Sequence, residues 1–473
     1  MRTRTTGRSM IRDGLIYHLL IILMVLLVLA GCGGSGGNGP AGDDGPIGDG
    51  PTADGLLKTP PGELQLKSST SCEAVTDYVA DSIAELILHS GLNVCPDCLR
   101  TAAGLPLVEV ADAAAPVPAT AAGRAGDGAR FADVTGTNTQ ESGVDELDII
   151  EADADGNFYL IDGRHLVVAK GAPPKDLSEL ASIDLDGIGQ PQGLLLDETN
   201  DRLVVVLSGD ALFGPAVFAP DIWLPPIVRL LFVDVSDPAD PVITRRLSID
   251  GYRIAARRIG SRVHLVSHFT PFMPAAITDS QELNDLRQQY FDAAAGGPGD
   301  ADALAQSIRD TVAALVAATD SSDYVPEIWQ QDGETDAVLL DDPTCADIAT
   351  PDVSMPFALT MVTSVDTDGS NVGRLAIANN AWNVYASEEN LYLMQTSAGW
   401  WWDRRQAQQT AIFKVRIGSG LPAFESLGLV DGWAASSYQF SEHDGFLRVA
   451  TNRWEIDPAT DRFLQHNNLY VLA

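Results

Sequence analysis

The sequence predicts an all-β protein, a sandwich, barrel or propeller, with a short N-terminal helical segment and one helical insertion. Short segments in which apolar and polar residues alternate recur from about residue 131 to the end, which is the period of a half-buried strand. Clusters of Asp, Asn and Gly separate these segments. Asp outnumbers Glu by 48 to 17. Because Asp favours turns and caps whereas Glu favours helices, this bias also indicates many tight turns between strands.

Composition excludes several classes of protein. The 473 residues include 45% hydrophobic residues, so the chain is neither a disordered polyanion nor a protein that crosses the membrane many times. The formal net charge of -35 opposes binding to phosphate backbones, which excludes nucleic acid as a partner.

Residues 1–31 have the composition of a bacterial signal peptide. Four arginines lie in the first twelve residues, and the apolar run that follows, Leu19 to Ala30, is shorter than the ~20 residues of a membrane span. The sequence LAGC at 29–32 resembles a lipobox, which implies a lipidated Cys32. The alternative is a free thiol after an ordinary signal or anchor helix. Gly33 follows the cysteine, which in lipoproteins favours the outer membrane. We therefore expect a protein of the bacterial cell envelope that contacts the membrane through its lipid alone.

Composition divides the mature chain into four parts. Residues 32–63 are rich in Gly, Pro and Asp and are expected to form a flexible tether. Residues 64–110 contain apolar residues at helical spacing between Val75 and Ile87. A second linker, 111–130, precedes a domain of expected strands, 131–473, whose Ala-rich insertion near 279–320 again has helical spacing. This insertion is either a packing module on the surface or a lid or docking element.

With Cys32 lipidated, four thiols remain, and an oxidising envelope would allow two disulfides in three connectivities. The four are Cys72, Cys95, Cys98 and Cys345. The CPDC motif that contains Cys95 and Cys98 also admits a redox-active pair or half of a metal site. We favour structural disulfides, because the chain has no second CxxC and no thioredoxin-like pattern around this one.

Three stretches carry a family resemblance. They are TNTQESGVDELDIIEADADGNFYLIDG at 137–163, YRIAARRIGSRVHLVS at 252–267 and YQFSEHDGFLRVAT at 438–451. They resemble landmarks of a bacterial family of secreted lipoproteins with a C-terminal β-propeller distantly related to WD repeats. The resemblance runs from about residue 70 to the end and assigns no catalytic residue. It implies that the strands form a β-propeller, and at four strands to a blade their number gives four to five blades. Members of that family continue past the strand NLYVL, which implies here either a shortened product or a small propeller that closes.

Two acidic turns have the alternating oxygen atoms that a calcium loop needs. One holds Asp153, Asp155 and Asn157, and the other holds Asp366 and Asp368. Neither continues to the distal Glu of an EF-hand, so ordinary turns are the alternative. Calcium is the one cofactor that the sequence suggests. His264 and His268 lie four apart on an expected strand, about 13 Å apart by strand rise, which is too far to share a metal.

Three adjacent tryptophans, Trp400, Trp401 and Trp402, lie in a polar connection and cannot all point into one core. Exposed indoles suit protein contacts, stacking on sugars or a membrane interface, and packing over a face of the domain or against the N-terminal helix is the alternative. No nucleophile elbow, HExxH helix or phosphate loop occurs in the sequence. The predicted function is therefore a lipid-anchored scaffold in the envelope that binds a protein or a glycan. The alternative is a propeller hydrolase or lyase with axial carboxylates, with or without calcium. Whether the protein is an enzyme stays open, and we favour a protein without enzymatic activity.

Overall fold

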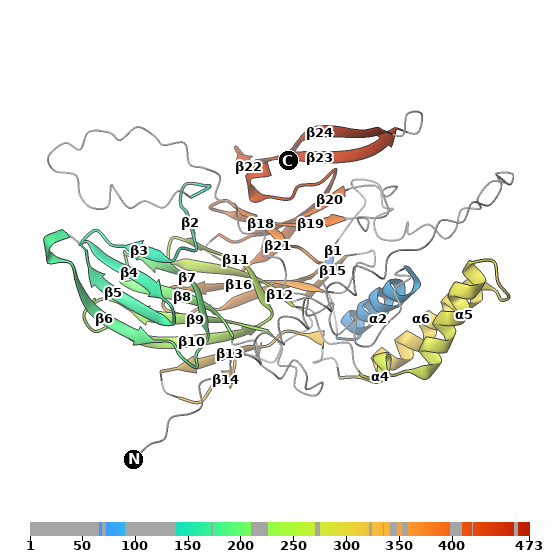
Figure 1. Cartoon of the computed structure of the whole chain (residues 1–473), viewed down its shortest axis with the longest axis horizontal. Helices are drawn as coiled ribbons and strands as arrows, with labels where there is room; N and C mark the ends of the chain where they lie inside the picture. Colours follow the sequence, from blue (N-terminus) through green and yellow to red (C-terminus); the bar gives the residue numbers. More distant parts are fainter. Residues whose placement is uncertain are drawn as a thin grey trace, which may run out of the picture. The chain divides into compact units, whose positions relative to one another are not determined.

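The computed structural model describes thirteen segments of the chain, all within the second of its two compact units, residues 51–473. The described segments are 66–68, 72–89, 139–171, 174–209, 226–269, 275–320, 324–333, 335–340, 348–351, 358–397, 409–418, 420–457 and 462–473. Their strands form five sheets that follow one another along the chain, which we number I to V (Figure 1).

Sheets I and II contain consecutive antiparallel strands. Sheet I consists of β3 (Ile150–Ala152), β4 (Asn157–Asp162), β5 (His165–Lys170) and β6 (Ser178–Asp184). Sheet II consists of β7 (Gln190–Asp197), β8 (Arg202–Ser208), β9 (Ile227–Asp234) and β10 (Val242–Asp250), extended at its outer edge by β13 (Ile328–Asp332) and β14 (Val338–Leu339).

Sheet III is the widest of the described sheets. Its four main strands are β11 (Tyr252–Ile259), β12 (Arg262–Phe269), β16 (Leu359–Asp366) and β17 (Gly373–Ala378). Beyond β17 come β15 (Ile348–Pro351), which is parallel to it, and then β1 (Leu66–Ser68). The opposite edge, along β11, is covered by the short strand β2 (Val144–Glu146).

Sheet IV has four strands and sheet V has three among the described residues. Sheet IV contains β18 (Asn383–Ala386), β19 (Asn390–Ser397), β20 (Gln409–Arg416) and β21 (Ala423–Asp431). Sheet V contains β22 (Phe440–His443), β23 (Phe446–Asp457) and β24 (Arg462–Leu472). Five sheets, the last with three strands among the described residues, agree with the four to five blades expected from the number of strands.

Each pair of successive sheets shares its own apolar cluster. Tyr159, Leu166 and Leu194 belong to the cluster between sheets I and II. Leu195 and Leu265 belong to the one between sheets II and III. The clusters between sheets III and IV and between sheets IV and V are built in the same way. Because middle strands such as β8 are buried on both faces, their sequence is a continuous apolar run rather than an alternating one.

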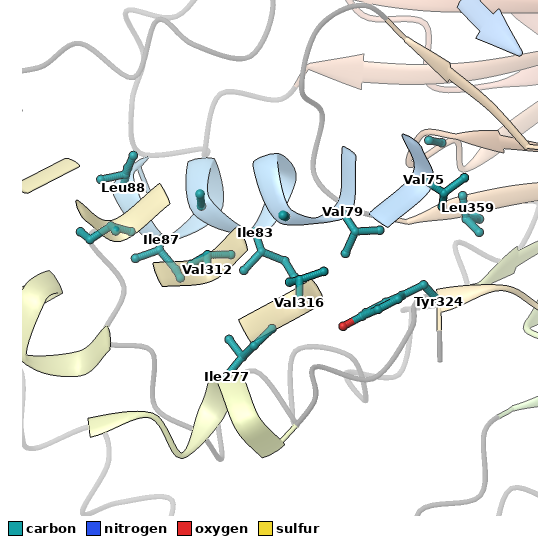
Figure 2. Close-up of a cluster of buried hydrophobic side chains, with 14 of the residues drawn as sticks. Val75, Val79, Ile83, Ile87, Leu88, Ile277, Val312, Val316, Tyr324 and Leu359 are labelled. Carbon is teal, nitrogen blue, oxygen red and sulfur yellow. The ribbon is translucent and has the colours of Figure 1, made fainter. Parts of the chain in front are cut away.

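The helices form a separate layer. α2 (Cys72–His89) packs on α6 (Ala301–Ala317). α4 (Ala275–Thr278) and α5 (Gln281–Ala294) also pack on α6. Figure 2 shows Val79 and Ile83 of α2 facing Val312 and Val316 of α6. Glu85 of α2 accepts hydrogen bonds from the guanidinium of Arg309 at 2.9 and 3.1 Å. The insertion expected near 279–320 therefore packs against the helix of the N-terminal segment.

Candidate functional site: the face that carries the long connections

The register of the strands distinguishes two ends of the sheets. At one end, β7 joins β8 through residues 198–201 and β11 joins β12 through residues 260–261. At the other end, β8 joins β9 through residues 209–226 and β12 joins β16 through residues 270–358, which include the helical insertion. We call the first end the turn face and the second the loop face.

The short links between successive sheets put the loop ends of all five sheets on the same side. One residue separates β10 from β11, and residues 379–382 separate β17 from β18. The long connection between β19 and β20, residues 398–408, also leaves from this side, since Ser397 pairs with Gln409. Because rigid sheets with long connections at one end typically carry binding residues there, the loop face is the candidate site.

Several large aromatic side chains are partly or largely exposed at the loop face, and five of them lie in or beside the links and connections at this end of the sheets. Their exposed fractions are 38% for Tyr252, 38% for Trp329, 39% for Trp382, 41% for Trp433 and 71% for Tyr438. Tyr252 is the first residue of β11, Trp382 immediately precedes β18, and Trp433 follows the end of β21. Trp329 pairs with Ser248 near the loop end of β10. The sheets therefore place aromatic residues that are far apart in the sequence at the same end of the strands.

The backbone around these aromatic residues is held in place. The Trp382 ring lies 4.3 Å from that of His268, and its backbone N–H donates to Met394 O at 3.2 Å. Burial lowers the pKa of His268 to about 4, so its imidazole is neutral at physiological pH. Trp433 exchanges two backbone hydrogen bonds with Asn452. A binding surface that is fixed before its partner arrives loses less entropy on binding.

A second feature lies along the inner edges of the sheets, where residues 139–151 form an entry segment. Gln140 donates to Ser437 O at 2.8 Å and to Phe440 O of β22 at 3.4 Å, and Glu141 accepts from the Tyr385 hydroxyl of β18 at 2.6 Å. β2 then pairs with β11, and Asp148 exchanges backbone hydrogen bonds with Leu194 of β7. The entry segment thus contacts the first strand of sheets V, IV, III and II before it becomes β3 of sheet I.

Carboxylates of the entry segment and of β3 interact with one another, namely those of Asp145, Asp148 and Glu151. Asp145 forms an ion pair with Arg258 at 2.9 Å. Burial, together with the charges of Asp145 and Asp148, raises the pKa of Glu151 to about 8. Glu151 lies opposite the buried Tyr159 on β4, so it belongs to the face of sheet I that packs on sheet II. No group of three or more His, Cys, Asp or Glu that could hold a metal ion occurs among the described residues.

Comparison with known families decides what this arrangement is. The model of the beta propeller domain matches residues 134–473. The chain belongs to the beta propeller domain family. The five sheets are the blades of this propeller, which confirms the expected fold class, and the helical layer is its insertion and N-terminal segment. No curated protein matches the chain.

The first acidic turn of the propeller forms local hydrogen bonds. Asp153 accepts from the backbone and the side-chain amide of Asn157 at 2.8 and 2.7 Å, and from the Tyr159 hydroxyl at 3.1 Å. The backbone carbonyl of Asp155 accepts from Lys170 at 2.7 Å. The carboxylate oxygens of Asp153 therefore organise the turn between β3 and β4. Calcium at this turn stays a prediction.

The second acidic turn is similar. Asp366 accepts from the Asn371 amide at 2.6 Å and pairs with Arg262 at 3.1 Å, while Asp368 accepts from the Ser370 backbone at 2.8 Å. Both acidic turns lie on the turn face, and they belong to sheets I and III. His264 is buried, and its Nδ1 lies 2.8 Å from the Ser364 hydroxyl.

Other predicted site residues fall outside the described part of the chain. These are the lipidation site Cys32, the thiols Cys95, Cys98 and Cys345, and the tryptophans Trp400, Trp401 and Trp402. Cys72 is the first residue of α2, and its side chain also lies outside what is described. The tryptophans belong to the connection between β19 and β20, whose flanking strands end and begin at the loop face.

Sequence reasoning missed the other aromatic residues of the loop face and the path of the entry segment. Trp382 and Trp433 are single aromatic residues in unremarkable sequence, and only the strand register shows that both lie at one end of sheet IV. Both positions become evident only from the strand bounds, because Trp382 directly precedes β18 and Trp433 follows the end of β21.

Proposed function

We propose that this β-propeller is a binding or scaffold module, anchored by lipid in the bacterial cell envelope, that contacts a protein or glycan partner through its loop face. The observation that carries the proposal is the group of exposed aromatic side chains where the long connections leave the blades. Exposed Trp and Tyr on a fixed backbone give a large contact area at a low cost in entropy, both for protein partners and for stacking on sugars.

The lipobox-like sequence and the tether support the anchored location. A lipid on Cys32 would hold the protein at the membrane, since each buried methylene contributes about 0.8 kcal/mol. Among the described residues, no helix has the length and apolar character to cross a membrane.

An axial enzyme is the second candidate, because a Glu with a raised pKa beside other carboxylates is an arrangement that hydrolases use. Two contacts weigh against it. Glu151 lies on the face of blade I that packs on blade II, and the entry segment itself covers the inner edges of blades II and III. We therefore place binding at the loop face first.

Anchoring is tested by labelling cells with a fatty acid analogue and by fractionating the envelope. The full chain should carry the label and sediment with membranes, whereas Cys32→Ala should lose the label and leave the membrane fraction. Unlabelled full chain in the cytosol would refute the anchored location.

Binding is tested by comparing the partner recovered by the full chain with that recovered by Trp382→Ala and Trp433→Ala variants. Each variant should reduce recovery of one reproducible protein or glycan at least about tenfold, as at a binding hot spot. Leu421→Ala is the matched control, because Leu421 is 66% exposed at the turn face. Equal recovery by all four proteins would contradict the proposal.

A further inference from the structure

Two arginines lie side by side near the loop end of blade II. Arg229 of β9 pairs with Ser248 of β10, and Arg246 of β10 pairs with Leu231 one row further from the loop face. Residues two positions apart on a strand share a face, and Leu231 belongs to the cluster between blades I and II. Both arginines therefore lie on the face of blade II that is turned to blade I, as diagonal neighbours within reach of each other.

Neither arginine forms an ion pair with a carboxylate among the described residues. Arg245, next to Arg246 in the chain, pairs with Asp332 at 2.6 Å on the opposite face of the sheet. Arg229 donates instead to the backbone carbonyl of Ile188, in the link between β6 and β7. The Nε of Arg246 is buried and donates to no acceptor in the described part of the chain. In a chain with 65 acidic and 30 basic residues, two such guanidiniums are unusual.

The carboxylates at the loop ends of β10 and β13 are engaged elsewhere. Asp250 accepts from the backbone N–H of Glu327 at 3.0 Å, and Glu327 accepts from the indole Nε1 of Trp329 at 2.9 Å. Burial and then the positive charge of Arg229 lower the pKa of Arg246, but an arginine keeps its proton in a protein. An anion bound between the two guanidiniums would compensate both charges.

An exposed tryptophan lies beside the two arginines. Across β10 and β13, Trp329 pairs with Ser248 and Gln331 pairs with Arg246, so Trp329 shares the face of the arginines. β13 and β14 extend blade II beyond β10, whereas the described part of blade I ends at its fourth strand, β6 (Figure 1). The Trp329 side chain is 38% exposed, and its bond to Glu327 fixes the orientation of the indole.

An indole next to two guanidiniums matches the chemistry of an acidic sugar. An aromatic face stacks on the apolar face of a sugar ring, and guanidiniums bind carboxylate or phosphate groups with paired hydrogen bonds. Trp329 and Arg229 are two strand spacings apart, about 10 Å, a distance that a short oligosaccharide spans.

We propose that Arg229, Arg246 and Trp329, the arginine-tryptophan site, bind a saccharide that carries carboxylate or phosphate groups. Trp329 stacks on a sugar ring, and the two guanidiniums share the anionic group. The inference rests on the proposed function, because Trp329 belongs to the loop face, and it names the class of glycan that the loop face binds.

The first test is calorimetric titration of the full chain in detergent with matched charged and neutral saccharides. The probes are trigalacturonate with its neutral methyl ester, and phosphorylated mannotriose with mannotriose itself. At least one anionic probe should bind at least about tenfold more tightly than its neutral counterpart, and more weakly as salt is added. The pair that shows the difference identifies the anionic group. Equal affinities within both pairs would overturn the inference.

Substitutions assign the binding to the arginine-tryptophan site. Arg229→Gln and Arg246→Gln should each remove the preference for the charged probe, and Trp329→Ala should weaken the charged and the neutral probe alike. Arg416→Gln is the matched control, because Arg416 is exposed at the turn end of β20 and the charge change is the same. Since Arg246 has no described partner, Arg246→Gln should unfold at the wild-type temperature or above it. Charge preference that survives in both arginine variants would contradict the site.

A further comparison separates this inference from the proposed function. If Trp382→Ala and Trp433→Ala lose a reproducible partner but no anionic probe is preferred, the loop face binds and the inference about the saccharide is wrong. If those two variants also recover the partner like wild type, the proposed function is wrong as well. Polyglutamate that binds more tightly than every saccharide would assign the arginines to an acidic peptide and overturn the inference.

Discussion

At the scale of single residues, burial determines the charge state of several groups. Glu151 has a pKa of about 8 because it is buried and faces the carboxylates of Asp145 and Asp148, with Arg258 opposing them. Burial lowers the pKa of His264 and of His268 to about 4. A rise in pH therefore has opposite effects through these groups. It lowers the contribution of Glu151 to stability, because the folded state retains the glutamate proton, and it raises that of the histidines, because they are neutral in the folded state.

Substitution of Glu151 tests this pKa. Between about pH 4.5 and 8 the folded state holds a proton on Glu151 that the unfolded state has released, so the contribution of Glu151 to the free energy of unfolding should decrease as the pH rises through this range. Glu151→Gln removes this loss. We expect the variant to be more stable than wild type by about 1–3 kcal/mol at pH 9 and nearly equal to it at pH 4, in denaturant titrations. If the difference in free energy of unfolding between the variant and wild type were the same at pH 4 and at pH 9, the raised pKa would be refuted.

The hydroxyl of Tyr385 is a second test at this scale. It donates to Glu141 of the entry segment at 2.6 Å and accepts from the backbone N–H of Glu442 at 2.7 Å. Tyr385→Phe leaves both groups without this partner, so we expect a loss of about 1–3 kcal/mol in the free energy of unfolding. Tyr438→Phe, at a side chain that is 71% exposed, should change it by less than about 0.5 kcal/mol. Equal effects would show that the entry segment is not held at blade IV by this bond.

At the scale of elements, the sequence predicted strands from alternation and helices from their period, and local chemistry explains both. Ser280 begins α5 by accepting from Leu283 N at 3.2 Å, and Asp300 caps α6 in the same way. The pairing of β1 with β15 was not predicted, since a strand of three residues carries no period. Nor was the path of the entry segment, because its partners lie up to 300 residues away along the chain.

The contact between α2 and α6 combines an ion pair with apolar packing, and substitutions separate the two. Val312 is fully buried, whereas the side chains of Arg309 and Glu85 are 39% and 25% exposed. Val312→Ala should lower the free energy of unfolding by about 2 kcal/mol, and Arg309→Ala by less than about 1 kcal/mol. Thermal unfolding of both variants measures this, and a larger loss for Arg309→Ala would contradict packing as the main source of stability.

At the scale of the whole molecule, the fold class followed from the sequence, but the site did not. Repeated short strands and Asp-rich turns are properties of local sequence, so they predicted an all-β fold directly, and the family resemblance selected the propeller among the all-β folds. The loop face depends on which strand ends share a side, and that depends on the links between blades, such as the single residue between β10 and β11. Tyr252 and Trp382 are 130 positions apart in the chain, yet both lie beside His268. Tyr252 pairs with His268 in sheet III, and the Trp382 ring, just before the first strand of sheet IV, lies 4.3 Å from the ring of His268.

Oxidative footprinting in isolated envelopes tests the central claim that the loop face binds a partner. Hydroxyl radicals modify exposed aromatic side chains, so Trp382, Trp433 and Tyr438 should be oxidised readily in the purified full chain. In envelopes, where the partner is present, their oxidation should decrease several-fold, while that of Leu421 at the turn face should not change. Equal oxidation of the three aromatic residues in both samples, or protection of Leu421 alone, would contradict the account.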